Sequence, residues 1–302
     1  MKIAVIGCGS MGCYFGSKLS EKNEVVFIDA FQKTVDTLNE YGITIKENDT
    51  EKNYNAPAFL SGKYDQEVDL VLLFVKSTQN LAALSENAKL FNEHTIVMSL
   101  QNGFGNDREI SRYVDPENIV LGNTLINCVT ETIGVVKKSG EGLTVVGSLV
   151  DNKENVIKAR LCLQQSGFTT DISNDIKSAI WKKVFVNATL NPLTALFNCK
   201  IKVVYENKNI WKLAEKIVEE AILVAEKDGC KFSYDEIIED LKKTCVNVGK
   251  GYPSMYQDVH NKRFTEIEKI NGQIVNYAYK YNVQAPYNEF VLNSIKAIER
   301  LY

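Results

Sequence analysis

The stretch MKIAVIGCGSMGCYFGSKLSEKNEVVFIDA, residues 1–30, decides the fold class of this chain. Its apolar run Lys2–Ile6, rich in β-branched residues, is typical of a buried strand, and helical spacing follows over Ser10–Lys22. A second apolar run, Glu24–Ile28, predicts another strand. A strand, a glycine-rich turn, a helix and a strand in this order predict the first unit of a dinucleotide-binding fold.

Three glycines and one acid carry the chemistry of this stretch. Gly7, Gly9 and Gly12 fit G-x-G-x-x-G: the first allows a tight turn, the second a close approach of backbone to a pyrophosphate, and the third close helix packing. Asp29 ends the second strand, where a carboxylate accepts hydrogen bonds from ribose hydroxyls and repels a 2′-phosphate. This favours NAD(H); with Lys33 nearby, NADP(H) remains open. The alternatives are a glycine-rich turn of another α/β protein and an ordinary surface acid.

The rest of the first half alternates between strands and helices, which predicts a parallel sheet covered by helices. The expected strands are Asp69–Val75, Thr95–Leu100 and the start of one at Asn118–Leu121, and the expected helices are Val35–Tyr41, Leu81–Phe91 and Asp107–Tyr113. A hairpin is expected over Glu131–Val146, with its turn at Ser139–Gly140.

After about Asp175 the pattern becomes helical throughout. The expected helices are Ala179–Leu196, Lys208–Asp228, Tyr234–Val246, Thr265–Tyr281 and Glu289–Leu301. We therefore predict an α/β Rossmann-type domain at residues 1–173, followed by an all-α substrate and catalytic domain at residues 174–302. The apolar C-terminal helices fit either a homodimer face or the core of their own domain.

Composition excludes several classes of protein. The 302 residues carry a net charge of −3, which favours neither nucleic acid nor an anionic membrane surface, and the apolar runs are too short to cross a bilayer. Seven cysteines with scattered spacing indicate a reduced, cytoplasmic protein. The two histidines, His94 and His260, are far apart in sequence, so we expect no metal site.

Polar residues follow two of the predicted strands. Lys76 comes after Asp69–Val75, and Asn102 comes after Thr95–Leu100. Ligands bind at the carboxyl ends of strands in open α/β sheets, so Lys76 is a candidate for a phosphate or substrate acid and Asn102 for the nicotinamide or the ketone. The alternatives are a solvated lysine and a common Asn-Gly turn.

A polar stripe runs along the helix predicted in AIWKKVFVNATLNPLTALFN, residues 179–198. Lys183, Asn187 and Asn191 follow one another at four-residue spacing, and most of the remaining positions are apolar. A buried cation with two amides is costly without partners, so we expect the stripe to face a polar cavity. Lys182 lies about 100° away and is the weaker catalytic candidate. The alternative is a helix edge that faces water.

A third stretch, YPSMYQDVHNKRFTEIEKINGQIV at residues 252–275, contains two capping-box spacings. Ser254 pairs with Gln257 and Thr265 with Glu268, so helix capping alone explains both hydroxyls. Glu266 then falls in the first turn of a helix, where the dipole favours an acid.

Together these blocks resemble the ketopantoate reductase (2-dehydropantoate 2-reductase) family. The matching segments run in family order over nearly the whole chain: GCGSMG, FVKSTQ, SLQNGFGN, IWKKVFVNATLNPLTALFNC and YPSMYQDVHNKRFTEIEKINGQIV. The resemblance implies a Rossmann domain and a helical domain with the active site between them, and NAD(P)H-dependent reduction of 2-dehydropantoate to (R)-pantoate.

The resemblance also implies roles for single residues. Lys183 corresponds to the general acid and Glu266 to the active-site glutamate. The residues matched to substrate binding are Asn102, Asn187, Asn191 and Ser254, and those matched to cofactor binding are Gly7, Gly9, Ser10, Met11, Gly12, Asp29, Lys76 and Asn102.

Two departures from the family pattern concern the substrate. Gly251 and Ile201 stand where many members have asparagine. A further departure concerns the cofactor: the NADPH-dependent members carry a basic residue soon after the second strand, whereas here Asp29 ends that strand. Some relatives are NAD-dependent D-2-hydroxyacid dehydrogenases that act on branched or aromatic 2-oxo acids. That activity is the alternative function for this chain, and a nucleotide-sensing protein without catalysis is a third hypothesis.

Overall fold

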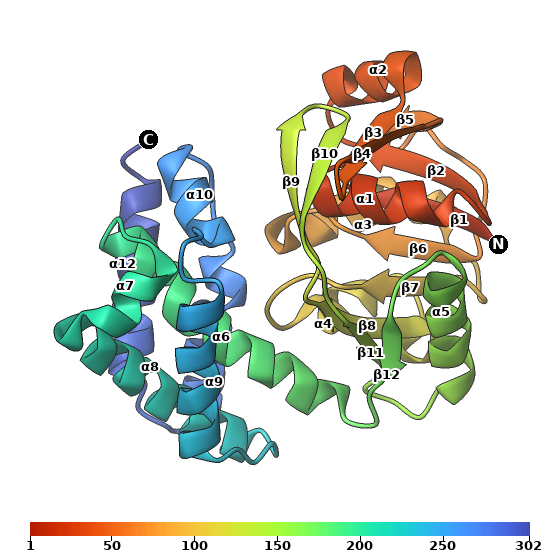
Figure 1. The fold of residues 1–302 in the computed structure, drawn as a ribbon. Coiled ribbons are helices and arrows are strands. Elements are labelled where there is room, and N and C mark those ends of the chain that lie inside the picture. Colours follow the sequence, from red (N-terminus) through yellow and green to blue (C-terminus); the bar gives the residue numbers. More distant parts are fainter. The chain divides into compact units, whose positions relative to one another are not determined.

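A sheet of eight strands organises the first part of the chain (Figure 1), and the computed structural model describes residues 1–302. In spatial order its strands are β12 (Thr170–Ile172), β11 (Thr144–Gly147), β8 (Ile119–Thr124), β7 (Ile96–Ser99), β6 (Leu70–Leu73), β1 (Lys2–Ile6), β2 (Glu24–Asp29) and β5 (Ala58–Leu60). All neighbours are parallel except β8 and β11. The central strands are apolar and buried, as expected for a sheet covered on both faces.

Five helices accompany this sheet, which confirms the predicted α/β Rossmann-type arrangement. They are α1 (Ser10–Leu19), α2 (Gln32–Tyr41), α3 (Asn80–Glu86), α4 (Asn106–Ile110) and α5 (Lys153–Gln165), with 3₁₀ turns at Ser77–Gln79, Ala88–Leu90 and Pro116–Asn118.

A second, smaller sheet of four strands was not expected from the sequence. Its order is β4 (Thr50–Tyr54), β3 (Ile43–Glu47), β10 (Val135–Gly140) and β9 (Asn127–Thr132). The turn predicted at Ser139–Gly140 is wrong, because these residues lie in β10 and the chain reverses at Ile133–Gly134. Gly134 has a φ of +77°, a conformation that glycine adopts without strain, so it supplies the turn.

Helices make up the rest of the chain, as predicted. They are α6 (Ile176–Leu196), α7 (Ile201–Glu206), α8 (Lys208–Lys227), α9 (Tyr234–Asn247), α10 (Ser254–His260), α11 (Asn271–Tyr281) and α12 (Pro286–Glu299). The predicted continuous helix from Thr265 to Tyr281 is wrong in its first part: a 3₁₀ turn at Ile267–Lys269 precedes α11. Ile270, with φ −104° and ψ −93°, interrupts the helical path between them.

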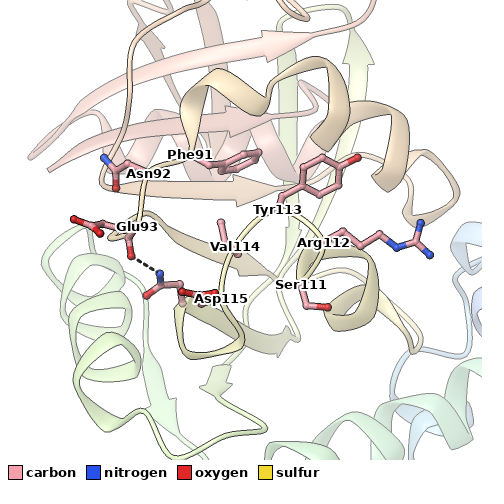
Figure 2. A pocket seen from close by; sticks show the side chains of 9 residues that line it. Phe91, Asn92, Glu93, Ser111, Arg112, Tyr113, Val114 and Asp115 are labelled. Atoms are coloured by element: carbon pink, nitrogen blue, oxygen red, sulfur yellow. Dashed lines mark hydrogen bonds between the residues drawn. The ribbon is translucent and has the colours of Figure 1, made fainter.

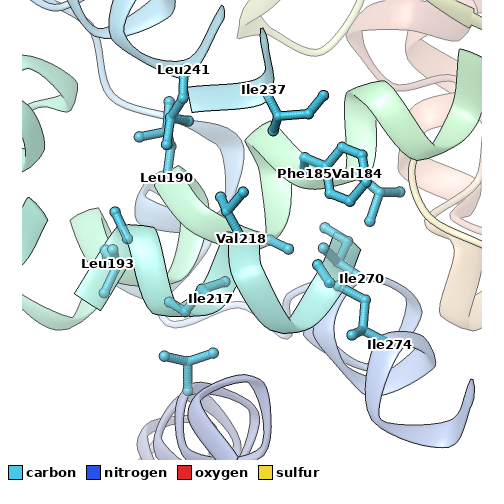
Figure 3. Close-up of a cluster of buried hydrophobic side chains, with 14 of the residues drawn as sticks. Val184, Phe185, Leu190, Leu193, Ile217, Val218, Ile237, Leu241, Ile270 and Ile274 are labelled. Carbon is cyan, nitrogen blue, oxygen red and sulfur yellow. The ribbon is translucent and has the colours of Figure 1, made fainter. Parts of the chain in front are cut away.

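The helical part has its own hydrophobic core, shown in Figure 3. Val184 and Phe185 of α6 are 1% exposed and belong to the same cluster as Ile270 and Ile274. A helix that buries residues on so many sides needs other helices around it, which agrees with the apolar residues that cover most of α6.

The chain separates into two compact units. The first comprises Met1–Gln101 and Gly105–Ala179, and the second comprises Asn102–Phe104 and Ile180–Tyr302. The predicted boundary between residues 173 and 174, with an α/β domain before it and an all-α domain after it, stays a prediction. No helix of the structure is both long and apolar enough to span a bilayer.

Candidate active site

The glycine-rich turn has the geometry that its sequence predicts. Gly7 has a φ of +100°, and a Cβ there would lie 2.5 Å from the backbone nitrogen of Val75, so only glycine fits. A Cβ on Gly12 would lie 1.9 Å from the Gly7 oxygen, which shows how closely α1 approaches the turn. A Cβ on Gly9 would meet nothing within 4 Å, so the space in front of this residue is open to a ligand.

Helix α1 begins at this turn with free backbone donors. Gly9 is its N-cap and provides no side-chain hydrogen bond, and the first helical bond runs from the Cys13 N–H to the Gly9 carbonyl, at 2.9 Å. The N–H groups of Ser10, Met11 and Gly12 therefore have no acceptor one turn earlier in the helix. Three such amides at the positive end of a helix suit a phosphate or pyrophosphate, so the turn fits a dinucleotide.

Asp29 is held directly beside the glycine-rich turn. Its Oδ2 accepts a hydrogen bond from the Cys8 N–H at 2.8 Å, and its Oδ1 accepts one from the Phe31 N–H at 3.0 Å. The parallel pairing of Ile6 with Ile28 brings the ends of β1 and β2 together and so places the acid there. Each carboxylate oxygen retains a lone pair for a ribose hydroxyl.

Lys76 follows β6, the neighbour of β1 on its other side. It is partly buried and stands directly before the 3₁₀ turn Ser77–Gln79. Because β1, β2 and β6 are parallel, their carboxyl ends share one edge of the sheet. The structure thus brings the predicted cofactor residues Gly7, Asp29 and Lys76 to the same edge.

The polar stripe lies within one continuous helix, α6. Lys183 and Asn187 are partly buried, Asn191 is 5% exposed, and Lys182 is exposed. Burial lowers the pKa of the Lys183 ammonium from 10.5 to about 8, although the negative charge of Glu266 raises it. A lysine that exchanges its proton near neutral pH is suited to general acid–base catalysis.

Glu266 and Asn102 come together in the second unit, although 164 residues separate them. The Asn102 Nδ2 donates to Glu266 Oε2 at 3.3 Å. Gly103 and Phe104 fix this contact: a Cβ on Gly103 would lie 2.2 Å from the Lys269 oxygen, and the Phe104 N–H donates to that oxygen at 3.0 Å. Sequence reasoning did not predict this pairing of Asn102 with Glu266.

Ser254 does not cap a helix, so this prediction is wrong. The N-cap of α10 is Pro253, whose carbonyl accepts the Gln257 N–H at 3.1 Å, and the exposed Ser254 is the first helical residue. Thr265 does cap locally, since its Oγ1 accepts the Ile267 N–H at 3.1 Å.

The two departures from the family pattern lie side by side. The Ile201 N–H donates to the Gly251 carbonyl at 3.3 Å, which joins the start of α7 to the segment that precedes Ser254. Ile201 is 8% exposed and Gly251 has no side chain, so neither position offers a polar side chain to a ligand.

A depression elsewhere in the first unit, shown in Figure 2, does not match this site. Its volume is about 310 Å³, and Glu93 and Asp115 are among its lining residues. Glu93 precedes β7 and Asp115 precedes β8, so the depression lies at the amino ends of parallel strands, opposite the edge where ligands bind. Asn118 Nδ2 already donates to the Glu93 carbonyl, at 2.8 Å.

The glycine-rich turn, the acid at the end of β2 and the titratable lysine define a class: oxidoreductases that use a nicotinamide dinucleotide. Models of ketopantoate reductase PanE/ApbA and of its C-terminal domain match residues 3–151 and 175–299. The chain therefore belongs to the ketopantoate reductase family.

Individual relatives agree with this family. The 2-dehydropantoate 2-reductase of Lactococcus lactis subsp. lactis (strain IL1403) is 32% identical, with 100% of this chain and 99% of the relative covered. The 2-dehydropantoate 2-reductase of Pyrococcus abyssi (strain GE5 / Orsay) is also 32% identical, with the same coverage. A solved structure of D-mandelate dehydrogenase with NADH and anilino(oxo)acetate is 33% identical, covers 99% of both chains and has a TM-score of 0.95.

Proposed function

We propose that this protein reduces a 2-oxo acid to a 2-hydroxy acid with a nicotinamide dinucleotide, and that 2-dehydropantoate is the leading substrate, giving (R)-pantoate. The observation that carries the proposal is Lys183, whose pKa is lowered to about 8 on a buried helix and which interacts with Glu266. The two curated relatives named above support the substrate.

Lys183 is the proposed general acid. When bound, the nicotinamide supplies the hydride to the carbonyl carbon, and negative charge then develops on the carbonyl oxygen. The Lys183 ammonium stabilises that charge and donates its proton to the oxygen. Glu266 keeps the ammonium protonated at neutral pH, because its negative charge raises the pKa that burial lowers.

The remaining polar residues bind and orient the substrate in this proposal. Asn187 and Asn191 follow Lys183 along the same face of α6 and offer amide donors to the ketone and its substituents. Ser254, released from a capping role, offers a hydroxyl to the substrate carboxylate. Asn102 orients Glu266 through its 3.3 Å hydrogen bond.

We propose NADH as the preferred cofactor. Asp29 is fixed by two backbone amides and presents a negative charge where a 2′-phosphate would sit. Ala30, Phe31 and Gln32 follow it without a positive charge to bind such a phosphate. The proposed residues around the pyrophosphate are Gly7, Gly9, Ser10, Met11 and Gly12, with Lys76 nearby.

A second candidate function is NADH-dependent reduction of other branched or aromatic 2-oxo acids to D-2-hydroxy acids. The adjacent Ile201 and Gly251 favour it, because they remove two polar side chains from the predicted substrate region. The structural similarity to D-mandelate dehydrogenase, solved with NADH, supports the same alternative.

Initial rates with NADH and NADPH on 2-dehydropantoate, 2-oxoisovalerate and benzoylformate distinguish these functions. Fast turnover of 2-dehydropantoate supports the leading proposal, whereas fast turnover of only the other two acids supports the second candidate. Lys183→Met is the test of the catalytic site, and Lys182→Met, one residue away and exposed, is its matched control. A folded protein that reduces none of the three acids would contradict both functions and favour nucleotide sensing.

We also propose that the protein works in the cytoplasm, since all seven of its cysteines are free thiols, as in a reducing compartment. The homodimer considered above remains a prediction that light scattering on the purified protein tests.

A further inference from the structure

Helix α6 contains a proline, Pro192, in its interior. Proline has no backbone N–H, so the carbonyl of Ala188, four residues earlier, lacks its usual donor within the helix. Ala188 is fully buried, so bulk water does not reach its carbonyl to replace the missing donor. The helix that carries Lys183 and Asn187 therefore has an open hydrogen-bonding position one residue after Asn187.

Asn271 supplies the missing donor from another helix. Its Nδ2 donates to the Ala188 carbonyl at 2.9 Å and to Asn288 Oδ1 at 3.1 Å, so both amide hydrogens are used. Asn271 is the first residue of α11 and is completely buried. Its side chain joins α6 to α11 at the turn that Pro192 opens.

The other end of this connection is fixed as well. Asn288 donates through its Nδ2 to Glu220 Oε2 at 2.8 Å and to the Ile217 carbonyl at 3.1 Å. Glu220 also accepts the backbone N–H groups of Tyr287 and Asn288, each at 2.9 Å. These bonds hold the amide of Asn288, and through it Asn271, against α8 and the start of α12.

Asparagine at position 271 carries a cost that leucine would avoid. Its Oδ1 is buried and accepts no hydrogen bond from the protein. An apolar side chain of similar size would remove that unsatisfied atom and fit the surrounding cluster, in which Ile270 and Ile274 lie with Val184 and Phe185 of α6 (Figure 3). The two hydrogen bonds that Asn271 Nδ2 donates must therefore offset the desolvation cost of its unsatisfied Oδ1.

Asn271 also lies close in sequence to Glu266, with only the 3₁₀ turn Ile267–Lys269 and Ile270 between them. We propose that Asn271 is a positioning residue, which fixes the segment carrying Glu266 to the proline-opened turn of α6 and so sets the placement of Glu266 against Lys183. The effect of Asn271 on catalysis rests on the proposed function, whereas its hydrogen bond between α11 and α6 does not.

Three variants test this role: Asn271→Leu, Pro192→Ala, and the two combined. Each is measured by thermal denaturation and by the pH dependence of Lys183 acylation with acetic anhydride, read by peptide mass spectrometry. Acylation follows the neutral amine, so it reports the titration of Lys183 without any need for turnover. The rate constant kcat/KM for 2-oxo acid reduction at saturating cofactor is the second readout.

We expect Asn271→Leu to lower Tm by about 2–4 °C or more, because it leaves the Ala188 carbonyl without a donor. We also expect the Lys183 titration to move to lower pH by about half a unit, since Glu266 is less well placed to favour the ammonium. The value of kcat/KM should fall about tenfold or more. In the double variant the new alanine N–H serves the Ala188 carbonyl, so Tm recovers while the Lys183 titration stays displaced.

Thr189→Val is the matched control. It removes another buried hydrogen bond of α6, from Thr189 Oγ1 to the Phe185 carbonyl at 2.8 Å, and leaves the hydrogen bond between α6 and α11 in place. We expect it to lower Tm and leave the Lys183 titration in place. The proposal is overturned if Asn271→Leu behaves like this control, or if the double variant restores the Lys183 titration together with Tm. A displaced titration in a protein that reduces no 2-oxo acid would support the positioning role and contradict the proposed function.

Discussion

Replacing Glu266 by glutamine tests how the charge next to Lys183 controls the reaction. Glutamine keeps the size of the side chain and an oxygen that accepts the Asn102 amide, so the 3.3 Å hydrogen bond is retained and only the charge is lost. The charge of Glu266 raises the pKa of Lys183 against the effect of burial. Without it, the pKa of Lys183 should fall further below its present value of about 8.

The size of the effect depends on pH. An opposite charge at close range shifts a pKa by about 1 unit or more, so the protonated fraction of Lys183 at pH 7.5 should fall from about three-quarters to about one-quarter. The reduction rate should then fall about threefold at pH 7.5 and change little at pH 6, where both proteins hold the proton. The assay is kcat/KM for 2-oxo acid reduction from pH 5.5 to 9.5 at saturating NADH.

Glu268→Gln is the control, because Glu268 is exposed and pairs with Lys296. In this control the fall of kcat/KM on the alkaline side should occur at the same pH as in the wild-type protein. A Glu266→Gln profile that is lowered equally at every pH would refute the electrostatic role and indicate that Glu266 contacts the substrate instead. A limb displaced to higher pH would contradict the sign of the interaction.

The remaining predictions concern the proposed general acid Lys183, the carboxylate of Asp29 and the glycines of the glycine-rich turn. Lys183→Met should abolish reduction yet raise the free energy of unfolding at pH 7 by up to about 3 kcal/mol, since it removes a charge that burial disfavours. This gain should be complete below pH 8 and vanish above pH 10.5, where the wild-type lysine is neutral in both states; a constant gain in urea titrations across that range would contradict it. Asp29→Asn should weaken NADH binding about tenfold and reduce the preference for NADH over NADPH, both measured by fluorescence titration. An equal loss of affinity for NADH and NADPH would argue against contact between Asp29 and the ribose. Gly9→Val should fold with an unchanged Tm but lose NADH binding, because its side chain enters the open space in front of the turn. Gly7→Ala should instead lower Tm by several degrees, because only glycine fits that position. A lower Tm for Gly9→Val together with an unchanged Tm for Gly7→Ala would refute these two roles.

The parts of the fold that the sequence predicted are those governed by local pattern. The strands of the central sheet are apolar on both faces, and α6 is apolar on most sides, so their periodicity is unambiguous. The four-stranded sheet was missed because β4 is exposed at four of its five residues and carries no apolar signal. The hairpin turn was misplaced because Ser-Gly and Ile-Gly each allow a turn, and only the pairing of β9 with β10 selects the second.

The candidate site divides in the same way. The stripe on α6 and the glycine-rich turn follow from spacing within one element, so sequence reasoning found them. The contact between Asn102 and Glu266 joins residues far apart in the chain, and no local pattern encodes it. The capping prediction for Ser254 failed because the preceding proline occupies the N-cap position, where its extended backbone begins the helix without a side-chain bond.

The membership of Asn102–Phe104 in the second unit has a consequence for how this protein is made. These three residues leave the ribosome long before α6, and the ring of Phe104 packs against Trp181 at 4.6 Å and Tyr277 at 5.8 Å. Phe104 therefore lacks its packing partners until α6 and α11 have been synthesised. A C-terminal fragment beginning at α6 would lack Phe104 and the amide that holds Glu266, so the two units are separable in space but not by cutting the chain once.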